Sequence, residues 1–232
     1  MEEGLVDRRK RTRAKRPVAP APPDLTDELE LVAGAPADLG ALQALEQRLV
    51  GLDLSGRSGD GLRLFESRVE DVDLSGSTLR RASMRDVVVD GGTWANVDAS
   101  NASMHRVEMR GVRLTSAGLA GVSLRDVSFV DCRMDLCSMR FARLERVRFD
   151  QCRMVEIDLY EAKLSSVGFT DCDLAHASLA KTTFASSELH ECNLDGVANP
   201  EQLRGVGMPW PDVLRSAAVL AAAVGVHVVD TE

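Results

Sequence analysis

Between residues 62 and 197 the hydrophobic positions recur with a period of five. An apolar residue, most often Leu, Met or Phe, stands at every fifth position for 27 successive units, from Leu64 to Leu194. A smaller residue such as Ala, Val or Cys usually lies two positions earlier, and the other three positions are mostly charged or Ser, Thr, Asn or Gly. A period of five fits neither a helix nor a strand. The pattern therefore predicts a repeat architecture.

A second period, of 20 residues, indicates that four units make one turn. Chemically alike residues recur at this spacing as an inward aromatic column, an outward arginine column and an inward cysteine column. The columns are Phe129, Phe149 and Phe169; Arg113, Arg133 and Arg153; and Cys132, Cys152, Cys172 and Cys192. Side chains in such a column lie alongside one another rather than pointing at each other, so free thiols are expected. The 27 units predict about seven turns.

Several units are close to a known repeat. Val72-Asp73-Leu74-Ser75-Gly76, Ile157-Asp158-Leu159-Tyr160-Glu161 and Cys172-Asp173-Leu174-Ala175-His176 each place an acidic residue between a small and a large apolar residue. This pattern resembles that of the pentapeptide-repeat family. The resemblance implies an all-β solenoid, a right-handed quadrilateral parallel β-helix with small helical caps. It also implies a possible partner, because some members resemble a DNA duplex in size and charge, bind DNA gyrase and are linked to quinolone resistance.

The composition of the chain divides it into four parts. Residues 1–23 combine a basic cluster with four prolines and are expected to be disordered. Residues 24–50 are expected to form a helical N-terminal cap, because Asp38 can cap a segment with Leu39, Leu42, Leu45 and Leu49 at helical spacing. Residues 51–198 carry the repeat. Residues 199–232 are expected to close it with a helix and a strand.

The C-terminal part contains a strongly apolar segment. A helix is predicted from Asp212, as its cap, to about Val224, ending at Gly225, and the valines from Val226 onward predict a final strand. The segment resembles the C-terminal caps of gyrase-binding family members, which implies a homodimer contact; capping within a monomer stays open as the alternative. The residues assigned to the cap or dimer contact are Leu214, Ala217, Ala218, Leu220 and Ala221.

The N-terminal basic cluster, here called the basic arm, has two interpretations. It is a contact for nucleic acid or an acidic partner, or a solvated tail without a dedicated partner. Direct binding of nucleic acid by this arm is the less favoured of its functional roles. Its residues are Arg8, Arg9, Lys10, Arg11, Arg13, Lys15 and Arg16.

Charge is distributed unevenly around the predicted coil. The chain carries a formal charge of −8, from 36 acids and 28 bases. The side centred on Val69 and its equivalents, here called the acidic side, has nine outward acids against three bases. The preceding side, centred on Leu64 and called the basic side, has a net charge of +3. The acids of the acidic side are Glu70, Asp71, Asp90, Glu108, Asp131, Asp150, Asp171, Glu188 and Glu191.

These features favour a protein-binding module over an enzyme. The four histidines form no HExxH motif, no GxGxxG or Walker loop occurs, and no cofactor or metal is expected. No secretory leader or bilayer-spanning stretch is evident, so a cytoplasmic location and no membrane contact are expected. Two functions stay open: a DNA mimic that binds and modulates DNA gyrase through the acidic side, or a scaffold that presents flat faces to another protein. The acidic residues have a third interpretation, which is that they only keep the repeat soluble.

Overall fold

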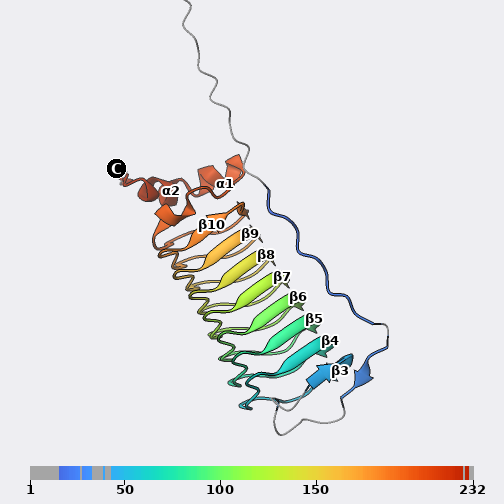
Figure 1. The fold of residues 1–232 in the computed structure, drawn as a ribbon. Helices are drawn as coiled ribbons and strands as arrows, with labels where there is room; N and C mark the ends of the chain where they lie inside the picture. The colour runs from blue at the N-terminus through green and yellow to red at the C-terminus, as the bar shows by residue number, and fades with distance from the viewer. Residues whose placement is uncertain (1–15, 27, 33–38, 40–42, 227, 230–232) are drawn as a thin grey trace, which may run out of the picture.

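The chain winds into a straight rod of stacked parallel strands, capped by short helices at its C-terminal end (Figure 1). The computed structural model describes residues 16–26, 28–32, 39, 43–226 and 228–229. The strands are β1 Glu30–Leu31, β2 Gln43–Leu45, β3 Gln47–Val50, β4 Arg63–Glu70, β5 Ser83–Asp90, β6 Ser103–Arg110, β7 Ser123–Val130, β8 Arg143–Asp150, β9 Lys163–Thr170, β10 Thr183–Ala185 and β11 Glu188–His190. The helices are η1 Pro200–Leu203, α1 Trp210–Arg215 and α2 Ala217–Ala223. The predicted right-handed quadrilateral β-helix is confirmed.

Each five-residue unit forms one side of the coil because its last residue turns the chain. From Gly51 to Gly196, the last residue of every unit has a left-handed φ, between 48° and 69°. Gly, Asn and Asp accept this conformation most readily, which explains their frequency at the corners. The central apolar residue of each unit then points inward, and its polar neighbours point outward.

The predicted columns form the interior of the rod. Neighbouring strands pair in parallel with a register of 20 residues, as in Leu64 with Met84. The rings of Phe129 and Phe149 stack with centroids 5.0 Å apart, and Phe169 continues the stack at the same spacing. The five cysteines are buried free thiols, as predicted. The 20-residue period was therefore the correct interpretation of the sequence.

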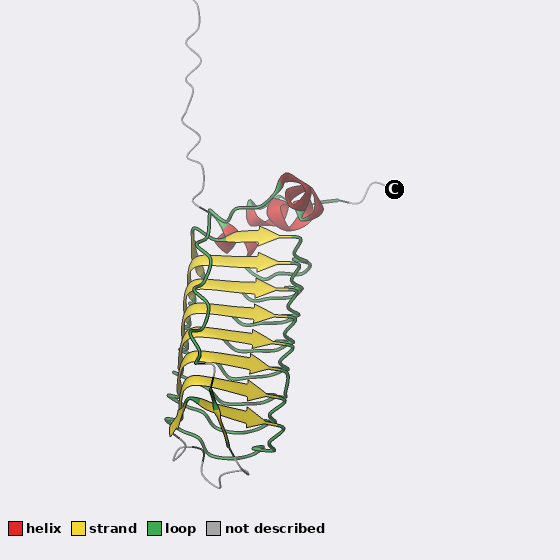
Figure 2. Cartoon of the chain, turned by 90° about the vertical axis from the view of Figure 1, so that its right-hand side faces the viewer, coloured by secondary structure: helices red, strands yellow, loops and turns green. Residues whose placement is uncertain are grey.

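The four sides differ in their hydrogen bonding. Strands β4–β9 run continuously over the basic and acidic sides and form the ladder seen in Figure 2. The other two sides, called the Leu74 side and the Leu79 side after their inward residues, pair only through isolated bridges such as Asp73 with Thr93 and Thr78 with Asp98. The acidic side and the Leu79 side lie opposite each other, because each coil takes the four sides in turn.

The helix predicted within residues 24–50 is wrong for its described part. Residues 43–50 form strands β2 and β3, which pair with β4. The reason is that Leu49 and Leu54 already belong to the five-residue series, and both are buried. The exposed edge of β4 offers them backbone partners that a helix would leave unpaired. The repeat thus begins earlier than predicted, giving about eight turns instead of seven. Asp38 and Leu42 lie outside the described residues.

A buried leucine closes the first coil. Gly59 seemed to break the apolar series, but it leaves room for Leu39. A Cβ at Gly59 would stand 2.8 Å from the Leu39 Cβ and 2.7 Å from the Leu79 Cδ2. The Leu39 N–H also donates to the Ser58 carbonyl at 3.0 Å. The missing side chain at Gly59 therefore accommodates a plug from outside the repeat.

The C-terminal cap is helical, but its details differ from the prediction. The apolar helix is divided at Ser216 into α1 and α2. Asp212 lies inside α1 rather than at its cap, and its Oδ2 accepts the Glu191 N–H at 2.8 Å, which ties the helix to the last coil. The predicted final strand is absent over described residues 226 and 228–229. Among the described residues, no helix is long and apolar enough to cross a bilayer.

Candidate protein-interaction surface

An extended segment of residues 16–24, here called the strap, runs along the outside of the rod (Figures 1 and 2). The Asp24 N–H donates to Asp86 Oδ1 at 3.0 Å, and the Ala21 N–H donates to Asp126 Oδ1 at 3.2 Å. The strap therefore runs opposite to the order of the coils. The predicted disorder of residues 1–23 is wrong for residues 16–23, because the aspartates of the rod give this segment hydrogen-bond partners that its own sequence does not reveal.

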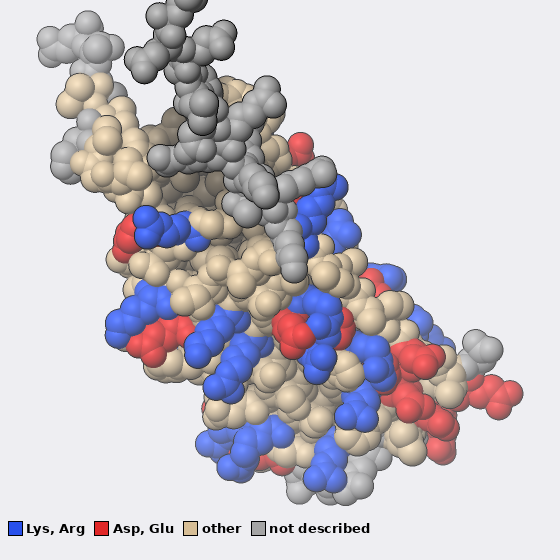
Figure 3. Space-filling model, turned by 45° about the horizontal axis from the view of Figure 1, so that its top comes forward, with Lys and Arg blue, Asp and Glu red and all other residues tan. Residues whose placement is uncertain are grey.

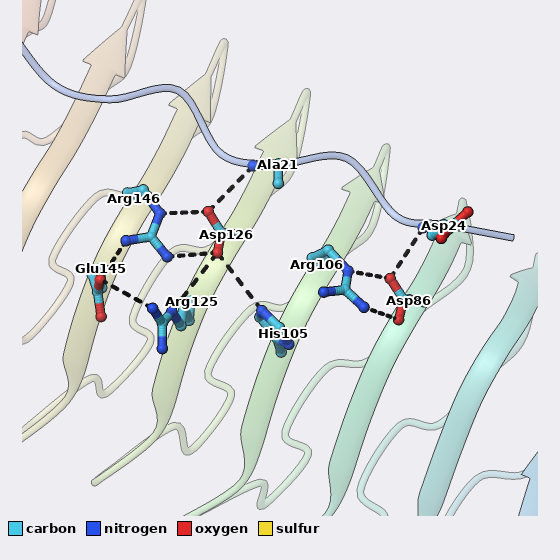
Figure 4. A network of polar contacts seen from close by, with 9 residues as sticks. All are labelled: Ala21, Asp24, Asp86, His105, Arg106, Arg125, Asp126, Glu145 and Arg146. Carbon is cyan, nitrogen blue, oxygen red and sulfur yellow. Dashed lines mark hydrogen bonds and ion pairs between the residues drawn. The ribbon is translucent and has the colours of Figure 1, made fainter.

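The strap lies on the corner between the basic and acidic sides. The corner is formed by the last residue of each basic-side unit, in a column called the corner row. Its members in successive coils are Glu66, Asp86, Arg106, Asp126 and Arg146. Arg106 donates from Nε and Nη2 to the two oxygens of Asp86, and Arg146 binds Asp126 in the same way at 2.6 and 2.7 Å (Figure 4). These forked contacts hold each carboxylate in one orientation.

Both strap-binding carboxylates are buried and charged. Asp86 is 2% exposed and Asp126 is 6% exposed. The hydrogen bonds from Arg146 lower the pKa of Asp126, aided by the Ala21 N–H and opposed by burial. For Asp86, burial acts to raise the pKa, but the hydrogen bonds from Arg106 and the Asp24 N–H outweigh it, so the pKa is lowered. A charged acceptor makes each strap hydrogen bond stronger than a neutral one would be.

Further polar side chains surround Asp126. His105 Nε2 lies 3.7 Å from Asp126 Oδ2, and Arg125 Nε lies 3.9 Å from the same atom. Burial lowers the pKa of His105, and the charge of Arg106 lowers it further. Glu145 accepts from Arg146 on the side away from Asp126 (Figure 4). The network therefore extends over the coils of β5 to β8.

The structure divides the nine predicted carboxylates of the acidic side into two groups. The first group is half-buried and ion-paired with neighbours: Glu70 with Arg48 at 2.8 Å, Glu108 with Arg110 at 2.6 Å, Asp150 with Arg148 at 3.1 Å and Glu188 with His190 at 2.9 Å. The second group is exposed and has no ion pair with any described residue: Asp71, Asp90, Asp131, Asp171 and Glu191. Only the second group presents free charge to a partner. Figure 3 likewise shows acidic and basic side chains interleaved on the face in view.

The N-terminal half of the strap covers part of the acidic side. A groove of about 230 Å³ separates Arg16, Pro17 and Pro20 from the rod. Its floor is formed by residues of β8, β9 and β11, among them Arg148, Gly168, Thr170 and Glu188. Arg16 is exposed and is the one member of the basic arm that the structure describes; the other six lie outside the described residues.

The family model for the pentapeptide repeat region matches residues 102–179 and 132–198. These matches and the square coil decide the family. The chain is a pentapeptide-repeat protein. No curated protein sequence matches the chain.

Several solved structures are similar to this chain. One is full-length QnrB1, a plasmid-mediated fluoroquinolone resistance protein, at 15% identity over 84% of this chain and 97% of that chain, with a TM-score of 0.38. A second is HetL from the cyanobacterium Nostoc sp. strain PCC 7120, involved in heterocyst differentiation regulation, at 18% identity over 75% and 92%, with a TM-score of 0.30. A third is Rfr23 from the cyanobacterium Cyanothece 51142, at 16% identity over 44% and 66%, with a TM-score of 0.37.

The C-terminal helices of this pentapeptide-repeat protein leave apolar surface uncovered. Of the residues assigned to the cap or dimer contact, Leu214 is 59% exposed, Ala217 and Ala218 are exposed, and Leu220 and Ala221 are half-buried. Trp210, which the sequence prediction did not include, is 70% exposed on the same helix pair. Within the described residues, no group of three or more His, Cys, Asp or Glu side chains could hold a metal ion.

Two outward features of the pentapeptide-repeat rod were missed from the sequence. The alternating acids and bases of the corner row stand 20 residues apart, so the column was visible, but nothing in the sequence linked it to the strap. The second feature is an aromatic pair on the Leu79 side. The rings of Phe141 and Tyr160 meet edge to face with centroids 5.6 Å apart, and the Arg140 guanidinium lies 4.7 Å from the Tyr160 centroid.

Proposed function

We propose that this pentapeptide-repeat protein is a non-enzymatic protein-binding module. Its contact surface is the group of exposed carboxylates on the acidic side, which meets a basic groove of a nucleic-acid-binding protein. The observation that carries the proposal is that Asp71, Asp131, Asp171 and Glu191 occupy equivalent corners along one edge and lack ion pairs with described residues. The family resemblance makes DNA gyrase the first partner to test.

The charge density of this edge bears on DNA mimicry. Asp71 and Glu191 are six coils apart, or about 29 Å at about 4.8 Å per coil. A duplex of that length carries about 17 phosphate charges, against the four of these corners and the one of Asp90. The proposed contact is therefore with a basic protein surface at a few defined points, and mimicry of a whole duplex is not required.

Supercoiling by purified DNA gyrase tests the proposal. We expect the wild-type protein to alter supercoiling, or to relieve a quinolone's effect, and Asp131→Asn/Asp171→Asn to weaken that action. The matched control is Glu156→Gln/Asp195→Asn, which removes two exposed carboxylates from the Leu74 side. Equal activity of both variants and wild type would show that the acidic side is not the contact, and inactivity of the wild type would exclude gyrase.

A scaffold presenting a flat face to another protein is a second candidate. It is favoured by the exposed Phe141, Tyr160 and Arg140 cluster on the Leu79 side, since aromatic and arginine side chains dominate many protein interfaces. Phe141→Ser with loss of partner capture, while Asp131→Asn/Asp171→Asn retains capture, would identify this face instead of the acidic side.

A homodimer through the C-terminal helices is a further proposal, supported by the exposed Trp210 and Leu214. In a symmetric dimer the same apolar patch would be buried twice. Light scattering coupled to gel filtration measures the mass directly. A dimer that becomes monomeric in Leu214→Glu supports the contact, whereas a monomeric wild-type protein excludes it.

A further inference from the structure

The strap is buried with a period of three. Pro17, Pro20 and Pro23 are half-buried, whereas the residues between them are exposed. A period of three is that of polyproline II, the conformation that proline-rich segments adopt with about 3.1 Å of rise per residue. One edge of the strap therefore faces the rod at every third residue, and each of these residues is a proline.

The spacing of the hydrogen bonds follows the same period. Ala21 and Asp24 donate from N–H groups three residues apart, which is about 9.3 Å in polyproline II. Their acceptors, Asp126 and Asp86, are two coils apart in the corner row, or about 9.6 Å at the strand spacing. The two rises agree within about 0.3 Å. A three-residue period in the strap therefore matches every second coil of the rod.

The sequence of both partners suits this match. Pro22 and Pro23 lack an N–H, so no donor between Ala21 and Asp24 is left without a partner. In the corner row the acceptors occupy alternate coils, and the intervening coils supply Arg106 and Arg146, which hold the carboxylates in place (Figure 4). The row thus has acceptors only at the levels where the strap has donors.

We propose that the corner row is a recognition site for an extended proline-rich segment that offers an N–H at every third residue. The strap is its resident ligand within the same chain. A segment of a partner protein with the same spacing displaces the strap and uncovers the acidic side beneath Arg16–Pro20. The recognition site does not rest on the gyrase proposal, because it is defined by the strap contacts alone.

A single-residue exchange in the full-length protein tests the site. Ala21→Pro removes one N–H donor and keeps the strap in polyproline II. Ala19→Pro is the matched control, because the Ala19 N–H donates to no described residue. In ¹⁵N NMR of the wild type and the control, we expect the Asp24 amide to be protected from exchange. In Ala21→Pro the protection falls about tenfold, as expected for loss of one hydrogen bond to a charged acceptor.

Peptides then test recognition between molecules. A fluorescein-labelled peptide of residues 16–26 is titrated against full-length Ala21→Pro and against wild type. We expect about tenfold tighter binding to Ala21→Pro, because the resident strap competes at high effective concentration in the wild type. The same peptide with proline at position 21 should bind about tenfold more weakly than the peptide with proline at position 19.

Three results would overturn the proposal. One is unchanged Asp24 protection in Ala21→Pro, which would show that the Ala21 hydrogen bond does not hold the strap. Another is equal binding of the two proline-substituted peptides, which would show that register is not recognised. The third is absence of peptide binding to both chains. Far-UV circular dichroism of each variant confirms that the rod stays folded, so that none of these results reflects unfolding.

Discussion

The acidic side and the Leu79 side face opposite directions on the same coils, and they differ in almost every outward property. The acidic side carries continuous strands, half-buried ion pairs and the strap that crosses its edge. The Leu79 side has isolated bridges and no strap, and its aromatic pair Phe141 and Tyr160 stands in the open. Both sides send the same kind of apolar residue inward at the same spacing. The interior therefore decides the fold, and the outward residues alone decide what each side can contact.

The largest expected difference between the two sides concerns their phenylalanines. Phe149, on the acidic side, stacks between two rings and is fully buried, whereas Phe141 is 51% exposed on the Leu79 side. Phe149→Ala should reduce the free energy of unfolding by about 3–5 kcal/mol, because it leaves a cavity in a closed column. Phe141→Ala should cost less than about 1 kcal/mol, because φ at this corner is 61° for either side chain and little burial is lost. Urea denaturation of both variants measures the difference, and equal losses would contradict it.

A smaller difference is expected between two aspartates. Asp126→Ala leaves the partly buried Arg146 without its forked partner and removes one strap acceptor, so a loss of about 2 kcal/mol is expected. Asp158, on the Leu79 side, lies 3.6 Å from a half-exposed Arg140, and Asp158→Ala should cost less than about 1 kcal/mol. Thermal unfolding of the two variants at the same ionic strength makes the comparison. A larger loss for Asp158→Ala would show that the corner row does not stabilise the rod.

The smallest expected effect is the response of strap docking to pH. Arg146 lowers the pKa of Asp126, so its contribution is complete above the ordinary aspartate pKa of about 3.9 and is lost as the pH falls through the lowered value. His105 has a lowered pKa because it is buried and lies near Arg106, so the folded state loses some stability as the pH falls below about 6.5. The Ala21 amide shift should change slightly between pH 7 and 5 and fully below about pH 4. His105→Gln should remove only the first change.

Much of the fold could be predicted because each coil repeats one rule. The five-residue series predicted the square coil, and the 20-residue period predicted the stacked Phe129, Phe149 and Phe169 and the buried free cysteines. Prediction failed at the N-terminal end of the rod. There the leucines of residues 39–49 fit a helical spacing, while Leu49 also fits the five-residue series. The open edge of β4 decided between the two, and an edge is a property of the neighbouring coil rather than of the segment itself.

The acidic residues show the same division. Their sides were assigned correctly from their position in the unit, but the sequence did not distinguish Glu108, paired with Arg110, from Asp131, which has no such partner among the described residues. That distinction depends on which long side chains of the same and adjacent coils can reach each carboxylate. A count of charges on a side therefore overstates the charge available to a partner.

The sequence by itself determined the path of the rod, because inward and outward positions alternate by a local rule that every coil satisfies in the same way. Only the tertiary structure decided where the strap lies. Ala21 and Asp126 are 105 residues apart, and no spacing within the sequence connects them. The contact depends on two rises that agree only after the coils have stacked, and on carboxylates that are held in place only when arginines of adjacent coils pack beside them.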